Sequence, residues 1–342
     1  MLRLPPFHFR LPKTLTEAAD ILTSEGSAAR VVAGGTDLWP NMKRRHQQAE
    51  TVVSLMRVPE LREVSNGAGD LVLGATLSLH EVATHETVRS AYPALATAID
   101  SISSPPLRHM GTIGGNVCVD TRCTYYNQTE DWRRAISYCM KEAGETCWVA
   151  PGSKRCLAHS ASDSAPILSA LGARVRLVSA QGNREIPLEN LYVDDGIEYL
   201  AKQPDEIVSA IVVPAAARVD RCRSAFWKLR RRGSIDFAVL SSSAALWTGE
   251  DGCIERAEIW LGAVSSRPLR ADAACDFLVG ETPDEETLRE AAAMARKPAT
   301  PFDNTDFQAQ WRGQMVVKYT EAALREAAGL DRERLPPRHN YL

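Results

Sequence analysis

The sequence lacks the features of several common protein classes. Its 342 residues contain no run approaching the ~20 apolar residues of a membrane span. The first twenty residues lack the apolar stretch of a secretory signal, which favours a cytoplasmic location. A net charge of −3 provides no basic field for nucleic acid, and no internal repeat is visible. What remains is an ordinary globular protein, long enough for two or three domains.

Common catalytic and nucleotide-binding motifs are missing as well. There is no GxGxxG, no phosphate loop ending in Gly-Lys-Ser/Thr, and no GxSxG. The stretch "HEVATH", from His80 to His85, is one residue longer than the HExxH of zinc proteases, whose spacing places both histidines on one helix face. No residue of the chain is therefore predicted to be catalytic.

Helix and strand patterns are mixed along the chain rather than repeated as regular strand–helix–strand units. Thr14 with Glu17 three residues later predicts the start of a helix. Alternating apolar residues around "AQGN" predict a hairpin over residues 173–188. Beyond residue 215 the pattern changes to paired strands followed by helices. The expected fold class is α+β.

Two glycine turns stand out, "AGGTDL" from Ala33 to Leu38 and "GTIGGN" from Gly111 to Asn116. Adjacent glycines let the backbone approach a ligand closely, and successive N–H groups in such turns form a concave site suited to a pyrophosphate. The hydroxyls of Thr36 and Thr112 would add hydrogen bonds to phosphate oxygens. Either turn alone is equally typical of a tight connection between a strand and a helix, so spacing alone names no nucleotide.

Four stretches taken together resemble a known family. In order, "VVAGGTDLWP", "GATLSLHEV", "RHMGTIGGNVC" and "SDSAPILSALGARVRL" are similar to the FAD-binding subunit of the molybdenum hydroxylases, the xanthine oxidase family. The resemblance continues through "KLRRRGSIDFA" and covers nearly the whole chain. It implies a PCMH-like FAD-binding fold of two subdomains and a C-terminal sheet-and-helix domain. The implied boundaries are 1–57, 58–215 and 216–330, with a tail at 331–342.

In that family the two glycine turns wrap the FAD pyrophosphate, and the flavin ring lies near the second turn. Asp163, in the "SD" motif, matches a residue that contacts the nucleotide. Lys228 matches a lysine near the flavin, although a surface lysine in a basic run is the alternative. The residues that the resemblance implies for FAD are Ala33, Gly34, Gly35, Thr36, Asp37, Leu38, Thr76, Thr112, Ile113, Gly114, Gly115, Asn116, Asp163 and Lys228.

Between Asn116 and Asp163 lies an insertion, residues 117–162, that carries four cysteines spaced C-x15-C-x7-C-x8-C: Cys123, Cys139, Cys147 and Cys156. In a reducing cytoplasm a metal, catalysis or burial is more plausible than a disulfide. Neither the paired CxxC of a zinc ribbon nor the C-x2-C-x2-C of a ferredoxin is present. From the spacing alone, Zn²⁺ and an iron–sulfur cluster both remain open, because both accept four thiolates.

The loop over 117–160 resembles the insertion in the β subunit of 4-hydroxybenzoyl-CoA reductase, the branch of the family whose flavin subunit carries an additional [4Fe–4S] cluster. The stretch "TYYNQ" and the final "RC" match along with the cysteines. The resemblance implies that Cys123, Cys139, Cys147 and Cys156 are the cluster ligands. Cys118, next to the second glycine turn, is either a buried thiol or a substitute ligand.

The resemblance implies an electron-transfer subunit that holds FAD and a [4Fe–4S] cluster, within a molybdenum-dependent oxidoreductase active in aromatic degradation. Its implied partners are a large molybdenum-cofactor subunit and a small subunit with two [2Fe–2S] clusters, assembled as a dimer of heterotrimers, with ferredoxin as the electron donor. The expected reaction removes a phenolic hydroxyl from an aromatic CoA thioester in the large subunit. The alternatives are the FAD subunit of another molybdenum hydroxylase, with the four cysteines binding structural zinc, and a self-contained FAD oxidase.

Overall fold

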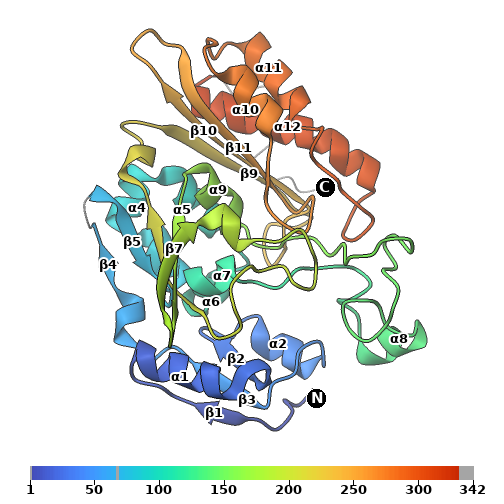
Figure 1. The fold of residues 1–342 in the computed structure, drawn as a ribbon. Coiled ribbons are helices and arrows are strands. Elements are labelled where there is room, and N and C mark those ends of the chain that lie inside the picture. Colours follow the sequence, from blue (N-terminus) through green and yellow to red (C-terminus); the bar gives the residue numbers. More distant parts are fainter. Residues whose placement is uncertain (1, 67–68, 331–342) are drawn as a thin grey trace.

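The computed structural model describes residues 2–66 and 69–330, and it stacks three β-sheets along the molecule (Figure 1). The mixture of helices with parallel and antiparallel strands confirms the α+β class. The predicted tail at 331–342 and two residues of the turn at 67–68 lie outside the described residues. No helix in the described part of the chain is long and apolar enough to cross a bilayer.

The N-terminal sheet is small and parallel, in the order β1-β3-β2, with β1 at His8–Arg10, β2 at Ala29–Val32 and β3 at Thr51–Ser54. Helix α1 (Leu15–Glu25) begins where predicted, because the Thr14 hydroxyl accepts a hydrogen bond from the Glu17 N–H at 3.1 Å. The Glu17 carboxylate accepts from the Lys13 N–H, one residue earlier than a full capping box requires. The first glycine turn joins β2 to α2 (Leu38–Lys43).

The middle sheet is antiparallel, in the order β4-β5-β8-β6-β7. Its strands are β4 (Val64–Ser65), β5 (Leu71–Gly74), β6 (Arg174–Ser179), β7 (Gly182–Pro187) and β8 (Ile207–Val213), so the predicted hairpin over 173–188 is confirmed as β6 and β7. Its helices are α3 (Leu79–Thr84), α4 (Glu86–Ala91), α5 (Pro93–Asp100), α6 (Pro105–Met110), α7 (Ile113–Val117) and α9 (Ser164–Ala170). Short 3₁₀ turns lie at Gly26–Ala28, Pro59–Arg62, Leu188–Leu191 and Ala215–Ala217.

The C-terminal sheet is antiparallel, in the order β12-β11-β10-β9, and is covered on both faces (Figure 1). Its strands are β9 (Arg223–Leu229), β10 (Leu240–Thr248), β11 (Ile254–Gly262) and β12 (Leu269–Arg270). Helices α10 (Asp272–Leu278), α11 (Glu285–Met294) and α12 (Ala309–Ala328) cover one face. The other face lies on α5 and α9, so Phe226, Ala245 and Trp260 belong to the core of the middle part.

The cysteine loop leaves the body of the molecule between α7 and α9 and carries a short helix, α8 (Glu130–Ala135), which projects to one side (Figure 1). The loop is fixed to the N-terminal part because the Tyr126 hydroxyl donates to the His46 carbonyl at 2.7 Å and Arg133 donates to the Arg44 carbonyl at 2.8 Å. It is also fixed to the C-terminal part, where Asn304 donates to the Leu157 carbonyl at 2.7 Å. The loop is therefore docked against two other parts of the chain.

Candidate functional site

A long groove of about 900 Å³ runs between the N-terminal and middle parts, within the size range of small-molecule and cofactor sites. Both glycine turns line it, together with the 197–204 segment and residues at the start of the cysteine loop. Three of the predicted FAD residues lie away from the lining: Ile113, which is fully buried in the core, and the pair Asp163 and Lys228. The predicted residues that line the groove are Ala33, Gly34, Gly35, Thr36, Asp37, Leu38, Thr76, Thr112, Gly114, Gly115 and Asn116.

The two glycine turns touch each other. A Cβ at Gly34 would lie 1.7 Å from the Met110 carbonyl oxygen, so the first turn fits against the end of α6 only without a side chain. Gly35 has φ +71°, a left-handed conformation that glycine adopts without strain. The chain therefore brings two segments, far apart in sequence, to one end of the groove.

In the second turn, Gly114 and Gly115 are glycines for different physical reasons. A Cβ at Gly114 would lie 2.6 Å from the Ala75 Cβ, so that glycine is required by packing against the middle sheet. Gly115 is exposed and lines the groove, and a Cβ there would approach only the Thr112 hydroxyl, at 3.0 Å. Gly115 thus forms an open cradle that a side chain would fill, which fits the close approach of a bulky anion such as a pyrophosphate.

The threonine hydroxyls of the groove differ in what they can offer a phosphate. The Thr112 hydroxyl accepts from the Gly115 N–H at 3.1 Å, which leaves its own hydrogen to donate. The Thr76 hydroxyl donates its hydrogen to the Leu61 carbonyl at 2.9 Å, so it has none for a phosphate oxygen.

Asn116 connects the second turn to the "SD" segment, because its side-chain oxygen accepts hydrogen bonds from the Ser162 and Ser164 hydroxyls at 3.0 and 2.6 Å.

Charged side chains that sequence reasoning missed stand where the groove meets the cysteine loop. Arg122 forms an ion pair with Asp37, and Lys141 forms one with Asp120 at 2.7 Å between the nitrogen and the carboxylate oxygen. Burial raises the pKa of Asp37, and the neighbouring Arg122 opposes that rise. The sequence signal was the "DTRC" stretch, in which Asp120 and Arg122 precede Cys123, but their partners are 21 and 85 residues away.

Asp163 and Lys228 form a buried ion pair behind the groove, with 2.6 Å between the carboxylate oxygen and the ammonium nitrogen. Lys228 also donates to the carbonyls of Ser101 and Asp236 at 3.1 and 3.0 Å. Burial raises the pKa of Asp163 and lowers that of Lys228, and each partner opposes the shift of the other. The pair joins the start of α9 to strand β9, and so fixes the C-terminal sheet to the middle part.

Replacing Lys228 by Met should lower the free energy of unfolding by about 3–5 kcal/mol, because it leaves the Asp163 carboxylate buried without its cation. The change should be seen as a lower urea midpoint measured by circular dichroism. The matched control is Lys154→Met on the exposed surface of the cysteine loop, which should leave the midpoint nearly unchanged. A Lys228→Met chain as stable as the wild type would show that the pair does not join the two parts.

The four loop cysteines are all buried, and Cys123, Cys139 and Cys156 belong to one apolar cluster with Tyr126 and Ala158. Burial raises the pKa of the Cys123 and Cys156 thiols, to about 12 and about 11, with neighbouring thiols adding to the rise. The Cys147 thiol also raises the pKa of the Cys139 and Cys156 thiols. All four sulfurs therefore lie in one region of the loop. Among residues 2–66 and 69–330, no group of three or more His, Cys, Asp or Glu is arranged as a metal site. Thiolates are nevertheless the type of ligand that soft metals and iron–sulfur clusters accept.

Cys118 does not belong to the cluster of four loop cysteines. It lines the groove and packs against the core of the middle part, and burial raises its pKa to about 11. Its carbonyl accepts a hydrogen bond from the Tyr199 hydroxyl at 3.0 Å. Cys118 is partly buried, and it packs with the core of the middle part rather than with the four loop cysteines.

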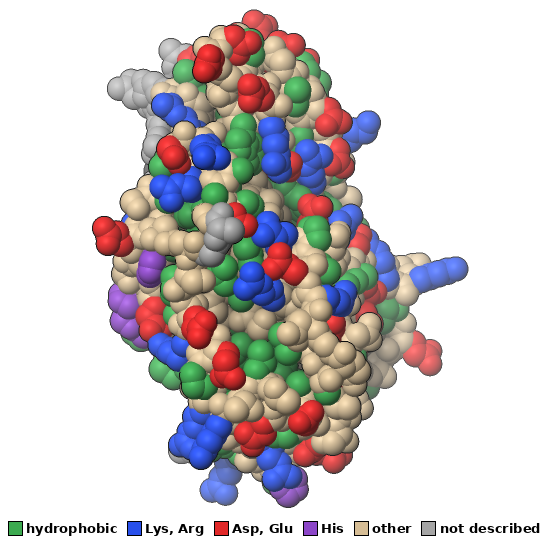
Figure 2. All heavy atoms as spheres, turned by 60° about the vertical axis from the view of Figure 1, so that its left-hand side comes forward, with side chains coloured by type: hydrophobic (Ala, Val, Ile, Leu, Met, Phe, Trp, Pro, Cys, Tyr) green, Lys and Arg blue, Asp and Glu red, His purple; other side chains and the backbone are tan. Residues whose placement is uncertain are grey.

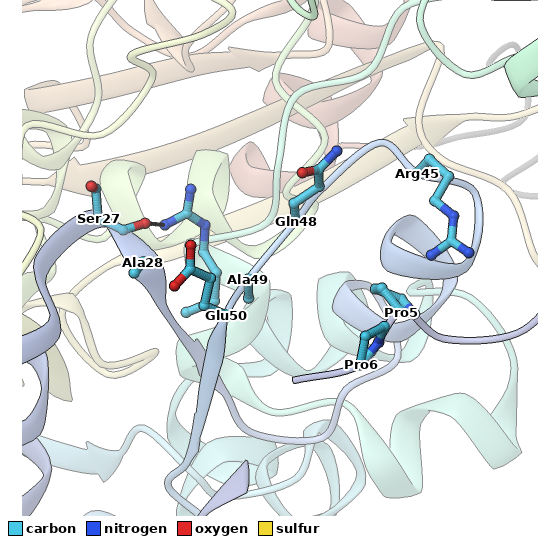
Figure 3. A pocket seen from close by; sticks show the side chains of 9 residues that line it. Pro5, Pro6, Ser27, Ala28, Arg45, Gln48, Ala49 and Glu50 are labelled. Carbon is cyan, nitrogen blue, oxygen red and sulfur yellow. Dashed lines mark hydrogen bonds between the residues drawn. The ribbon is translucent and has the colours of Figure 1, made fainter. Parts of the chain in front are cut away.

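A second hollow, of about 570 Å³, lies beside the N-terminal sheet and holds none of the predicted site residues (Figure 3). Its lining includes Arg30, Arg45 and Glu50, and the Arg30 guanidinium already donates to the carbonyls of Ser27 and Ala29, both at 2.9 Å. On the face shown in Figure 2, basic and acidic side chains are interspersed rather than gathered by sign. Neither this hollow nor the surface in Figure 2 is a better candidate for the cofactor site than the groove.

Comparison with known proteins identifies the family of this chain. Residues 5–216 match the family of the FAD binding domain in molybdopterin dehydrogenase, and residues 224–327 match the CO dehydrogenase flavoprotein C-terminal domain. The chain belongs to the molybdopterin dehydrogenase flavoprotein family. The chain is an FAD-binding subunit of a molybdenum-containing oxidoreductase.

Curated relatives extend over nearly the whole chain. The carbon monoxide dehydrogenase medium chain of Afipia carboxidovorans is 26% identical over 94% of this chain and 96% of its own length. The aldehyde oxidoreductase FAD-binding subunit of Escherichia coli is 31% identical over 78% of this chain and 84% of its own. Carbon monoxide dehydrogenase from Hydrogenophaga pseudoflava has a solved chain with TM-score 0.80 and 25% identity, covering 96% of this chain and 99% of that one. The similarity to these chains confirms the predicted fold and family.

Proposed function

We propose that this flavoprotein carries a [4Fe–4S] cluster on Cys123, Cys139, Cys147 and Cys156 in addition to FAD, and passes electrons between the two. The observation that carries the proposal is the grouping of four buried thiols in one docked loop beside the FAD groove. Flavin exchanges one or two electrons, so it can connect a one-electron cluster to two-electron chemistry. A cluster also gives a long polar loop a structural centre, because four metal–sulfur bonds take the place of an apolar core.

The cysteine loop also favours an assignment within the family. On its resemblance to 4-hydroxybenzoyl-CoA reductase, the complex would remove a phenolic hydroxyl from an aromatic CoA thioester at the molybdenum of a large subunit. Electrons would enter from ferredoxin, pass through the cluster and FAD, and continue through a small subunit with two [2Fe–2S] clusters. A dimer of such heterotrimers in the cytoplasm completes the proposal. The names of relatives include carbon monoxide and aldehydes, so the shared fold does not determine the substrate. The substrate proposed here rests on the cysteine loop.

The deciding experiment counts iron, acid-labile sulfide, zinc and flavin on one anaerobically purified sample of the full chain. About four irons and four sulfides with one flavin per chain would support the two-carrier subunit. One zinc without sulfide would identify the loop as a structural clip and leave FAD as the redox centre of this chain. In that case the reductase assignment fails and another molybdenum hydroxylase becomes the better interpretation.

A further inference from the structure

The wall of the FAD groove and the cluster of four loop cysteines meet at Gly196. The Gly196 N–H donates to the Cys156 carbonyl at 2.9 Å, and a Cβ at Gly196 would lie 2.6 Å from the Cys156 sulfur. The backbone therefore passes directly beside a proposed ligand sulfur. The next residues along the chain, Ile197 to Gln203, line the groove. One short segment of chain thus touches both cofactor sites.

Lys141 holds this contact from the side of the loop. Its side chain is only 5% exposed, and its ammonium group donates to the Gly196 carbonyl, to Asp120 at 2.7 Å and to the Thr121 hydroxyl at 2.8 Å. The ammonium nitrogen also lies 5.2 Å from the ring centre of Tyr126 and 5.6 Å from that of Tyr199. Lys141 lines the groove itself, so this one cation borders both the FAD site and the cysteine loop.

We propose that Lys141 is the positioning residue that couples the two carriers, by holding the Gly196 segment against Cys156 so that electrons cross there. The proposal rests on the cluster proposed above. In each event the reduced cluster loses one electron and the flavin gains one, with a low-potential one-electron donor supplying the cluster. No bond to the protein forms or breaks. The positive charge of Lys141 also stabilises the more negative, reduced form of each carrier, since net charge near a cluster sets its potential.

The electron-transfer test uses Lys141→Met and the conservative Lys141→Arg in the full chain with both cofactors loaded. After a one-electron pulse from pulse radiolysis, equilibration between flavin and cluster should slow by about tenfold or more in Lys141→Met, and the cluster potential should fall. Lys141→Arg should restore both, because it keeps the charge. Wild-type rates and potentials in Lys141→Met would overturn the proposal.

A second variant covers the case in which Lys141→Met fails to retain a cofactor. Gly196→Ala keeps the lysine but pushes a methyl group toward the Cys156 sulfur, so equilibration should slow as well. An unchanged rate in Gly196→Ala would count against the Gly196 contact as the crossing point.

Hydrogen exchange separates failure of this proposal from failure of the proposed function. If the wild-type chain holds no iron, the cluster assignment fails, but the positioning role is still measurable in the absence of metal. Amides of residues 194–200 should then exchange about tenfold faster in Lys141→Met than in the wild type or in Lys141→Arg, because the buried hydrogen bonds of the ammonium are lost. Unchanged exchange would show that Lys141 does not position this segment.

Discussion

Replacing Gly115 by Val should weaken FAD binding enough for the cofactor to be lost on desalting, while the chain stays folded. Gly115 is open to the groove, and within the chain a Cβ there would approach only the Thr112 hydroxyl. Valine would therefore project into the groove, where we expect FAD to bind, rather than displace protein. Overpacking of a fitted contact costs about 1–3 kcal/mol, so the Kd for FAD should rise by up to about 100-fold.

The measurement is the flavin absorbance that remains bound after desalting, with circular dichroism to confirm the fold. Gly152→Val is the matched control, because a Cβ at that loop position meets nothing within 4 Å. Gly114→Val is a poorer probe, since it clashes with Ala75 and would lose FAD through misfolding of the turn. Wild-type FAD content in Gly115→Val would place the pyrophosphate away from the second glycine turn.

Replacing Cys139 by Ala should remove the proposed cluster while leaving most of the FAD bound. Cys139 lies in the cluster of cysteine thiols of the docked loop, whereas the glycine turns that line the groove are built from other segments. A [4Fe–4S] cluster needs four protein ligands, so loss of one thiolate should lower iron from about four to below one per chain. Iron, sulfide and flavin are counted on the same sample.

Cys118→Ala and Cys253→Ala are the controls for Cys139→Ala. Cys118 packs near the groove and Cys253 belongs to the C-terminal part, so both variants should keep full iron. Unchanged iron and sulfide in Cys139→Ala would exclude Cys139 as a ligand. Loss of iron in Cys118→Ala would mean that the ligand set includes Cys118 and that the loop is arranged differently from the proposal.

Local sequence patterns were enough to predict most elements around the groove. An apolar run that ends in two glycines predicts a strand, a turn and a helix, and these are β2, the first glycine turn and α2. The Thr14 cap and the hairpin over 173–188 follow from neighbours a few residues apart. The glycine turns could be placed at the site only through the resemblance, because a tight turn and a phosphate cradle share one local sequence.

Long-range contacts could not be predicted from the sequence. Lysine is rarely buried, so the sequence offered Lys228 as a lysine near the flavin or on the surface, and not as the partner of Asp163, 65 residues away. Nor does a sequence show that the Thr76 hydroxyl is committed to Leu61, or that Gly114 is a packing residue and Gly115 an open one. Each of these depends on which side chain comes to face it in the folded chain.

The shared core beneath strand β9 limits how this protein can be divided. Phe226, Ala245 and Trp260 pack into the interior of the middle part, while their strand neighbours face the C-terminal helices. A chain that ended near residue 216 would uncover α5 and α9 and leave a broad apolar surface in water. During synthesis the groove can therefore reach its final stability only after the ribosome has delivered the last sheet, and a cofactor that binds there would be inserted late.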